Sequence, residues 1–304
     1  MTQLPQVTST ERVRGPRDFV APVGDAFTQR PLEAEDPRWR TFRVVYPAHR
    51  PDREENKNYA ATVRLPVGMP RGLIVVLPIL GGDYGPSEAF ATHLAGAGFT
   101  TMRFDRKAEI FDASKDFRHV AMMMTQGVID VRRGLAWARR SRLAGRGRIG
   151  VLGISMGSFV GTLVAATDPD VDAAALALGG AGLPKILFAA QSEKEIGALF
   201  AGLRARGYDD DRIRAEMVRD LSSVDPIHYA KALDPTRTLL VHARLDGVVP
   251  FENGQQIYEA MGRPRRLVTM TGHYTAALLL PVILAEVEAH FSRQLDPVPT
   301  WRAP

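Results

Sequence analysis

A short motif of one serine flanked by two glycines constrains this sequence more than any other feature. The stretch at 148–158 reads Arg-Ile-Gly-Val-Leu-Gly-Ile-Ser-Met-Gly-Ser and contains the pattern Gly153-x-Ser155-x-Gly157. The apolar run before the motif is typical of a buried parallel strand, and the residues after it suit a packed helix. Gly153 and Gly157 remove side chains that would collide at a tight strand-to-helix turn. The motif therefore predicts that Ser155 is a nucleophile exposed at such a turn.

Apolar segments of strand length alternate with segments of helix length along most of the chain. Strands are expected, in order, at 41–46, 60–65, 73–77, 99–104, 149–152, 173–178, 238–243 and 266–270. Helices are expected at 86–97, 117–142, from the serine motif to about 166, at 251–261 and at 275–293. Alternation of this kind argues for an α/β fold, with a mostly parallel sheet covered by helices on both faces. A polar stretch separates the first two strands, which favours an antiparallel entry to the sheet.

The composition is that of a globular protein and excludes some kinds of chemistry. The chain has 304 residues, of which 45% are hydrophobic and 24% charged, and it has no cysteine. Disulfides, thiolate metal sites and a cysteine nucleophile are therefore excluded. No histidine or acidic cluster shows the spacing of metal ligands. We expect neither a metal nor another cofactor.

The chain is basic, with a formal net charge of +5 and a pI of about 9.6. Its densest basic group, at 139–148, holds five arginines without interleaved aromatic residues, so we expect a solvated helix end rather than a nucleic-acid site. Met1 to Pro31 lacks the apolar core of a signal peptide, and no unbroken apolar run reaches 18 residues. We expect a cytoplasmic protein without membrane contact whose partner is a small molecule. The sequence leaves the oligomeric state open.

Two further residues complete a candidate catalytic triad. A serine nucleophile needs a base, and the base needs an orienting acid; after a motif of this kind the acid comes first and the histidine second. Asp246 follows the expected strand at 238–243, and His273 follows the one at 266–270. Because the carboxyl ends of parallel strands meet at one edge of a sheet, we expect these side chains to lie together with Ser155. We predict Ser155 as nucleophile, His273 as base and then acid, and Asp246 as orienting acid.

Acyl transfer also requires two hydrogen-bond donors for the oxyanion of the tetrahedral intermediate. The residue after the nucleophile supplies one, the backbone N–H of Met156. The second is expected in the loop that follows the strand at 73–77, which reads Pro-Ile-Leu-Gly-Gly at 78–82. Leu80 is the first choice, and Ile79 and Gly81 are the alternatives.

About fifty residues interrupt the alternation of strands and helices at about 180–234. This insertion contains helical patterns at 189–207 and 210–221 and several apolar residues without local partners. Insertions of this length are usually functional, so we expect a small helical cap over the pocket in which Phe188 and Phe200 bind substrate. The alternative is that these apolar side chains pack only among themselves. We expect residues 1–38 to be an irregular extension and 39–304 to be one domain that carries the cap.

From about Leu73 to Phe291 the sequence resembles an α/β-hydrolase. The motifs that carry the resemblance are Gly-Ile-Ser-Met-Gly at 153–157, Asp-Gly-Val-Val-Pro at 246–250 and Gly-His at 272–273. Within that superfamily the chain is similar to serine esterases of the dienelactone-hydrolase-like and prolyl-oligopeptidase-like branches. The resemblance implies a hydrolase of carboxylic esters that forms an acyl-enzyme without a cofactor. The sequence departs from the usual pattern in the oxyanion loop, where Pro78-Ile79 replaces His-Gly.

Other activities remain open on the same triad. They are hydrolysis of thioesters, hydrolysis of amides or peptides, and perhydrolysis without a cofactor. A rival of another class is a binding protein that keeps the fold without catalysis. Such proteins commonly lose a member of the triad, whereas this chain has a candidate for each position.

Overall fold

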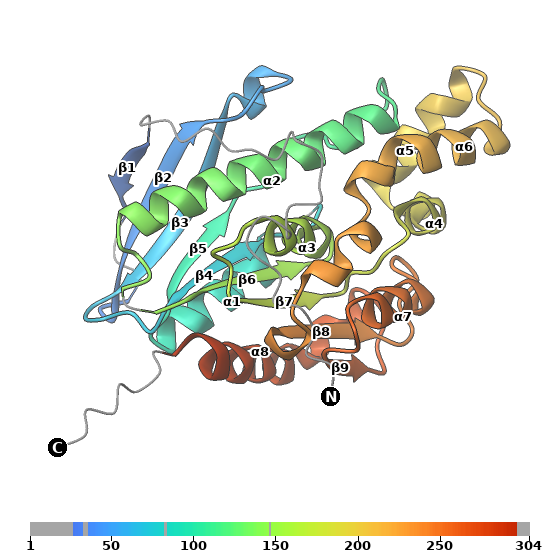
Figure 1. Ribbon diagram of the computed structural model, residues 1–304. Coiled ribbons are helices and arrows are strands. Elements are labelled where there is room, and N and C mark those ends of the chain that lie inside the picture. Colours follow the sequence, from blue (N-terminus) through green and yellow to red (C-terminus); the bar gives the residue numbers. More distant parts are fainter. Residues whose placement is uncertain (1–26, 33–35, 82–83, 146, 297–304) are drawn as a thin grey trace.

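A nine-stranded sheet lies at the centre of the structure, in the order β1-β2-β3-β5-β4-β6-β7-β8-β9 (Figure 1). The computed structural model describes residues 27–32, 36–81, 84–145 and 147–296. The strands are β1 (Thr28–Pro31), β2 (Trp39–Pro47), β3 (Asn58–Pro66), β4 (Leu73–Leu77), β5 (Thr100–Phe104), β6 (Ile149–Ile154), β7 (Ala173–Ala177), β8 (Thr238–Ala243) and β9 (Arg265–Thr269). Neighbours from β5 to β9 are parallel, whereas β1, β2, β3 and β5 pair antiparallel. The expected mostly parallel sheet with an antiparallel entry is therefore confirmed.

Helices cover both faces of the sheet (Figure 1). One face carries α1 (Gly85–Gly96) and α8 (Leu280–Leu295), and the other carries α2 (Phe117–Arg140), α3 (Met156–Thr167) and α7 (Phe251–Ala260). The insertion forms α4 (Leu183–Ala189), α5 (Lys194–Ala205) and α6 (Asp210–Leu221). Short 3-10 helices are η2 (Glu54–Asn56), η3 (Ala190–Ser192), η4 (Ser222–Val224), η5 (Pro226–His228), η6 (Ala230–Ala232), η7 (Pro235–Arg237) and η8 (Thr275–Leu279).

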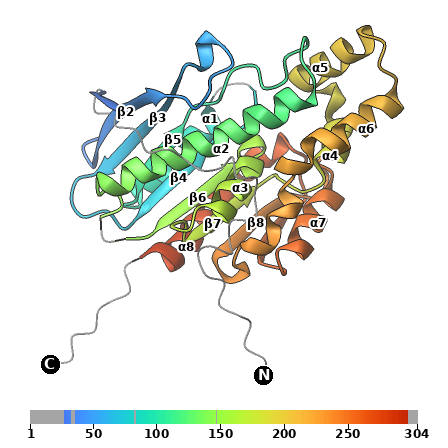
Figure 2. The same ribbon diagram turned by 45° about the horizontal axis from the view of Figure 1, so that its top comes forward.

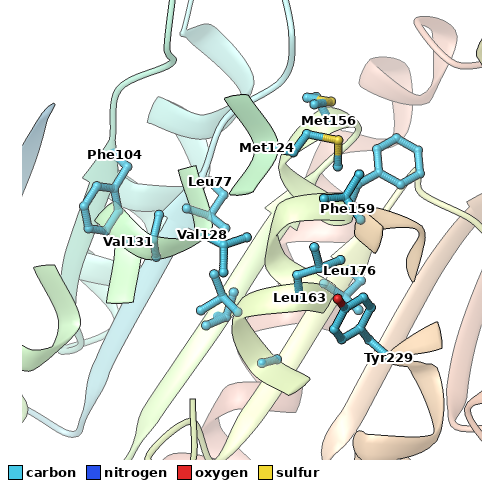
Figure 3. Packing of buried hydrophobic residues seen from close by; sticks show 14 of the residues in the cluster. Leu77, Phe104, Met124, Val128, Val131, Met156, Phe159, Leu163, Leu176 and Tyr229 are labelled. Atoms are coloured by element: carbon cyan, nitrogen blue, oxygen red, sulfur yellow. The ribbon is translucent and has the colours of Figure 1, made fainter. Parts of the chain in front are cut away.

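The sheet separates two hydrophobic cores, one on each face, and each central strand contributes side chains to both. In β4, Val75 and Leu77 face the core under α2 and α3, whereas Ile74 and Val76 face the core under α1 and α8. All five side chains of β4 are buried, which explains its unbroken apolar sequence. Figure 3 shows the first of these cores, where Leu77 of β4 lies beside Val128 of α2. Burial of each such side chain contributes about 1.5–3 kcal/mol, so the two cores hold β4 firmly between the helical layers.

One strand differs from expectation. Residues 28–31, which the sequence analysis places in an irregular extension, form β1 and pair with β2 at the edge of the sheet. All four residues are exposed, and their Thr-Gln-Arg-Pro sequence has no apolar alternation. The segment pairs with the edge strand β2, and the neighbouring Phe27 ring stacks on Tyr46 of β2 and on Trp137 of α2. The four exposed side chains of β1 themselves give no sequence signal of this pairing. Residues 1–26 lie outside the described part of the chain.

The last helical stretch, Thr275–Leu295, is long and predominantly apolar. Among the described residues it is the one helix with the length and composition of a membrane span, with a mean hydropathy of 1.4 over 18 residues. The expectation that no unbroken apolar run reaches 18 residues still holds, since Glu286 and Glu288 interrupt this stretch. Ile283, Val287 and Phe291 of this helix are buried against the sheet, which accounts for part of its apolar composition.

The cap lies at the end of the sheet where β6 and β7 finish (Figures 1 and 2). Its two ends meet at one side chain. The Asp225 carboxylate accepts hydrogen bonds from the backbone N–H groups of Gly182 (3.0 Å) and Leu183 (2.8 Å) at the start of α4, and from Ile227 (3.1 Å) in η5. The segments at which the insertion leaves and rejoins the sheet are therefore hydrogen-bonded to each other through Asp225.

Candidate active site

Ser155 lies in a strained turn between β6 and α3. Its backbone has φ 51° and ψ −116°, a conformation that costs energy for any residue with a side chain. The backbone is crowded on both sides, because a Cβ on Gly153 would overlap the Gly157 carbonyl and one on Gly157 would overlap the Leu77 carbonyl of β4. The Ser155 N–H is held by the carbonyl of Ala177 at 2.8 Å. This packing forces the hydroxyl outward, as the motif predicts.

The structure brings the three predicted residues of the triad together. Ser155 Oγ lies 2.9 Å from His273 Nε2, and His273 Nδ1 lies 2.7 Å from Asp246 Oδ2. A carboxylate can only accept hydrogen bonds, so the proton of the neutral imidazole is on Nδ1. His273 Nε2 is then free to accept the Ser155 proton. The two side chains of the His273–Asp246 pair are 8% and 2% exposed, which strengthens their hydrogen bond.

Local turns fix the acid and the base. The second oxygen of Asp246 accepts hydrogen bonds from the N–H groups of Val248 (2.9 Å) and Val249 (2.8 Å), just past the end of β8. The His273 turn is closed by Thr275, whose hydroxyl accepts from the Gly272 N–H at 2.8 Å. Because Asp246 has three donors around it, its carboxylate cannot rotate away from the imidazole. Asp246 and His273, which the sequence places directly after strands, are therefore each held in place by hydrogen bonds of the local turn.

The expected oxyanion donors line the cavity beside Ser155. Met156 is the first residue of α3, so its N–H has no acceptor within the helix. Ile79, Leu80 and Gly81 follow β4 and border the same cavity. Leu80 therefore stays the predicted second donor, with its two neighbours as alternatives. Gly82, the last residue of the predicted loop, lies outside the described residues.

An apolar cavity of about 500 Å³ opens beside the serine. Ser155 and His273 border it, and the other described lining residues are mostly aliphatic or aromatic. Glu193, Glu195 and Tyr274 add polar groups. Pockets of about 300–1,000 Å³ with apolar walls and few polar groups are typical of small-molecule sites. No three His, Asp or Glu side chains gather as metal ligands would, in the residues for which the structure gives positions.

The cap contributes to the cavity with residues other than the two phenylalanines that we predicted. Ile186, Leu187 and Ile196 border it, whereas Phe188 and Phe200 are not among the lining residues. Phe200 is fully buried and packs edge to face against both Phe188 and Phe117 of α2. The Arg214 guanidinium covers Phe188. These rings attach the cap to α2, and the substrate-binding assignment of Phe188 and Phe200 is corrected.

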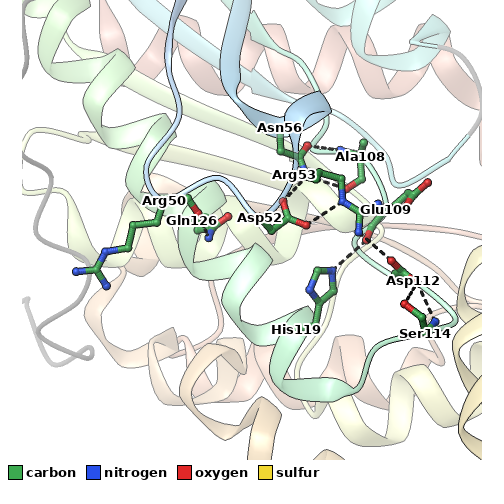
Figure 4. A network of polar contacts seen from close by, with 10 residues as sticks. All are labelled: Arg50, Asp52, Arg53, Asn56, Ala108, Glu109, Asp112, Ser114, His119 and Gln126. Atoms are coloured by element: carbon green, nitrogen blue, oxygen red, sulfur yellow. Dashed lines mark hydrogen bonds and ion pairs between the residues drawn. The ribbon is translucent and has the colours of Figure 1, made fainter.

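Sequence reasoning missed the long loop between β5 and α2. Phe111 of this loop borders the cavity. Figure 4 shows the polar network that holds the loop, in which Arg53 pairs with Asp112 at 2.8 Å and with Glu109. Asn56 of η2 exchanges hydrogen bonds with the Ala108 backbone at 2.8 and 3.1 Å. The network connects the β2–β3 hairpin to the cavity wall, a long-range relationship without a local sequence signal.

A second missed contact connects the cap to the catalytic turn. The hydroxyl of Tyr274, the residue after His273, donates a hydrogen bond to the Glu193 carboxylate beside η3. Partial burial, with a smaller contribution from Glu193, raises the pKa of Tyr274 to about 12. The hydroxyl therefore keeps its proton, and remains a donor, throughout the neutral range. The sequence signals for this contact are weak: an acidic residue in the cap, Glu193, and a tyrosine next to the predicted base, Tyr274.

Residues 112–274 match the model of the prolyl oligopeptidase family. This range is more than half of the chain and includes Ser155, Asp246 and His273. The chain belongs to the prolyl oligopeptidase family. The oxyanion loop at 78–81 precedes the matched range, so the family match does not extend to Leu80. No curated protein matches the sequence.

Solved structures share the fold of this member of the prolyl oligopeptidase family. Acetyl xylan esterase 1 from Thermoanaerobacterium sp. JW/SL YS485 is 14% identical, with 86% of this chain and 88% of that chain covered and a TM-score of 0.66. The acetyl xylan esterase from Paenibacillus sp. R4 is 17% identical over the same shares, with a TM-score of 0.67. An esterase from Pyrococcus furiosus is 16% identical, with 90% and 97% covered and a TM-score of 0.56. At these identities the likeness establishes the α/β-hydrolase fold.

Proposed function

We propose that this protein is a serine hydrolase of carboxylic esters that works through an acyl-enzyme. The hydrogen-bonded series from Ser155 Oγ through His273 to Asp246, at 2.9 and 2.7 Å, is the observation that carries the proposal. It has the geometry that nucleophilic catalysis by serine requires, and it borders a cavity of substrate size. The esterase structures of the same fold agree with this chemistry.

In the first half of the reaction, Ser155 Oγ attacks the ester carbonyl while His273 Nε2 accepts its proton. The Asp246 carboxylate stabilises the imidazolium that forms. The carbonyl oxygen becomes an oxyanion, which receives hydrogen bonds from the N–H groups of Met156 and Leu80. The tetrahedral intermediate then collapses, and His273 transfers the proton to the leaving alkoxide. The products of this half are the alcohol and Ser155 esterified by the acyl group.

In the second half, a water molecule takes the place of the alcohol. His273 Nε2 removes a proton from the water as it attacks the acyl-enzyme carbonyl. The same N–H donors stabilise the second oxyanion. Collapse of this intermediate returns the proton to Ser155 Oγ and releases the carboxylic acid. The enzyme regains its starting protonation state without an added cofactor.

The lining of the cavity favours esters over peptides. A peptide main chain carries an N–H and a C=O at nearly every residue, and burial of these groups without partners is costly. The described lining offers few side-chain partners, because apart from Ser155, His273 and Tyr274 its polar side chains are the carboxylates Glu193 and Glu195. An ester places one polar group at the triad and apolar groups against the walls.

A fluorophosphonate probe tests the proposal. The probe should label wild-type protein and leave Ser155→Ala unlabelled, while Ser158→Ala, one helical turn further along α3, should be labelled as the wild type is. Hydrolysis of a p-nitrophenyl ester and of a peptide p-nitroanilide by the same preparations measures the preference for esters. Faster Ser155-dependent cleavage of the anilide would assign the triad to peptide chemistry. Absence of labelling in folded wild-type protein would rule out a serine hydrolase.

A further inference from the structure

The cavity beside Ser155 has walls from two different cores. One part is bordered by Phe90 of α1 and by Leu280 and Ile283 of α8, which belong to the core on the α1–α8 face of the sheet. We call this part the α1–α8 lobe. The other part is bordered by residues that belong to the opposite core, among them Phe159 of α3 and Leu187 of α4. We call this part the cap lobe.

Ser155 lies at the junction of the two lobes. Ile154, directly before it, packs in the core on the α1–α8 face, and Met156, directly after it, packs in the opposite core. The oxyanion loop is divided in the same way, since Ile79 packs against the first core and Leu80 against the second. An ester carbonyl held at Ser155 therefore has an apolar space on each of its two sides.

We propose that the substrates of this enzyme are esters that are apolar on both sides of the ester bond, with the acyl group in one lobe and the alcohol group in the other. The proposal rests on the esterase function proposed above. A volume of about 500 Å³ divided between two lobes suits two groups of several carbons each. An acetyl group would leave most of its lobe empty, and each unfilled methylene forfeits favourable burial.

The lining also disfavours polar alcohols. Sugar hydroxyls need hydrogen-bond partners when they are buried, and an unpaired hydroxyl opposes binding. In the α1–α8 lobe, Pro86, Phe90, Leu280 and Ile283 offer no side-chain partner. In the cap lobe, Phe111, Phe159, Ile186, Leu187 and Ile196 offer none either. The two glutamates of the lining, at residues 193 and 195, come from the cap, and neither α1 nor α8 contributes a charged side chain to the described lining.

The test is a matrix of substrates in which acyl and alcohol chains are lengthened independently. We expect kcat/KM to rise in both series, by about fourfold for each added methylene until a lobe is filled. Acetylated xylo-oligosaccharide should be hydrolysed at least 100-fold less efficiently than the best apolar ester. A series in which acetate esters are best, or in which only one chain length matters, would overturn the proposal.

Two variants fill one lobe each. Ala277→Phe places a ring at the cavity border next to the α1–α8 lobe, and Val248→Phe places one in the cap lobe. Each has a matched control outside the lining, Ala285→Phe on an exposed site of α8 and Leu245→Phe in the exposed turn before Asp246. One filled lobe should shorten the preferred acyl chain by about two carbons and the other the preferred alcohol chain. The controls should keep the wild-type profile.

The outcomes separate this proposal from the esterase function itself. If both variants shorten the same series, or neither shortens any, the division into acyl and alcohol lobes is wrong. Labelling of Ser155 by the fluorophosphonate probe would still support esterase function in that case. Loss of labelling in the wild type would instead remove the basis of both proposals.

Discussion

The guanidinium of Arg106 donates a 2.6 Å hydrogen bond to the carbonyl oxygen of Gly81, across the gap between β5 and the oxyanion loop. Arg106 is further anchored to Tyr84, whose hydroxyl accepts from the Arg106 N–H at 3.0 Å and whose ring lies 4.5 Å from the guanidinium. The arginine thereby fixes the end of the loop that contains Leu80. Oxyanion stabilisation depends on donors that are in place before the reaction, so under the proposed mechanism this contact positions the loop that supplies the second donor.

Replacement of Arg106 by Gln should therefore lower kcat by about tenfold to 100-fold and change KM by less than threefold. A donor displaced by a fraction of an ångström loses much of its stabilisation of the transition state and little of substrate binding. Steady-state kinetics on a p-nitrophenyl ester measure both constants, and Arg140→Gln at the exposed end of α2 is the control for loss of charge. A rise in KM with unchanged kcat would show that Arg106 binds substrate instead.

Replacement of Asp246 by Asn should lower kcat by about 10⁴-fold and leave the melting temperature within a few degrees of the wild type. The amide oxygen can still accept from the Val248 and Val249 N–H groups, but the amide cannot stabilise the imidazolium. Single-turnover kinetics measure the loss of catalytic rate, and thermal unfolding measures the melting temperature. Glu252→Gln, at an exposed carboxylate on α7, should stay within twofold of the wild type. Full activity of Asp246→Asn would assign the role to another acid.

The hydrogen bond between Tyr274 and Glu193 should couple the cap to the catalytic turn. A double-mutant cycle with Tyr274→Phe and Glu193→Gln should show a coupling energy of about 0.5–1.5 kcal/mol in the unfolding free energy. Hydrogen exchange in η3 and the first turn of α5 should accelerate in both single variants, since the cap loses a tether. Tyr208→Phe, elsewhere in the cap, is the control. Strictly additive single effects would mean that the two side chains do not interact in solution.

Two buried histidines should make the protein less stable in acid. Burial, and secondarily nearby arginines, lower the pKa of His242 and of His290 to about 4, from an ordinary value of 6.5. Between these values the unfolded chain binds protons that the folded chain does not, so unfolding is favoured as the pH falls from 6.5 to 4. Each histidine should contribute a loss of about 3 kcal/mol over that range.

Chemical denaturation at pH 7 and pH 4.5 measures this loss, and His242→Gln should reduce the difference between the two pH values. NMR titration of the folded protein gives an independent check, because neither imidazole should titrate above pH 5. A folded-state pKa near 6.5 for both rings would contradict the expectation.

Much of the fold could be predicted because the deciding signals are local. The observed bounds of β4, β8 and α6 equal the expected ones. In each of these elements the order of apolar and polar residues along the chain is enough to predict which side chains are buried. The positions of Ser155, Asp246 and His273 follow from the rule that parallel strands end at one edge. The sequence order of motifs is enough to bring these three residues together.

Other features could not be predicted because they depend on distant partners. The Thr28–Pro31 strand depends on backbone pairing with β2 and on the neighbouring Phe27, whose ring stacks on Tyr46 and Trp137. Phe188 and Phe200 are apolar residues of an insertion. From the sequence alone, such side chains could line the cavity or pack toward α2, and the structure shows the second arrangement. Arg106 is an ordinary basic residue after a strand until the loop after β4 is placed beside it. Each of these assignments needs the tertiary structure.

The Asp225 carboxylate, which joins the start of α4 to η5, has an evolutionary consequence. Because the insertion leaves and rejoins the sheet at one hydrogen-bonded point, its length can change without moving β7, β8 or the triad. Loop-closure entropy grows only slowly with length, at about 0.6 kcal/mol for each doubling, so such changes cost little stability. One wall of the cavity can therefore change in length and sequence independently of the strands that hold Ser155, Asp246 and His273, which would allow the proposed substrate range to diverge while these three residues stay in place.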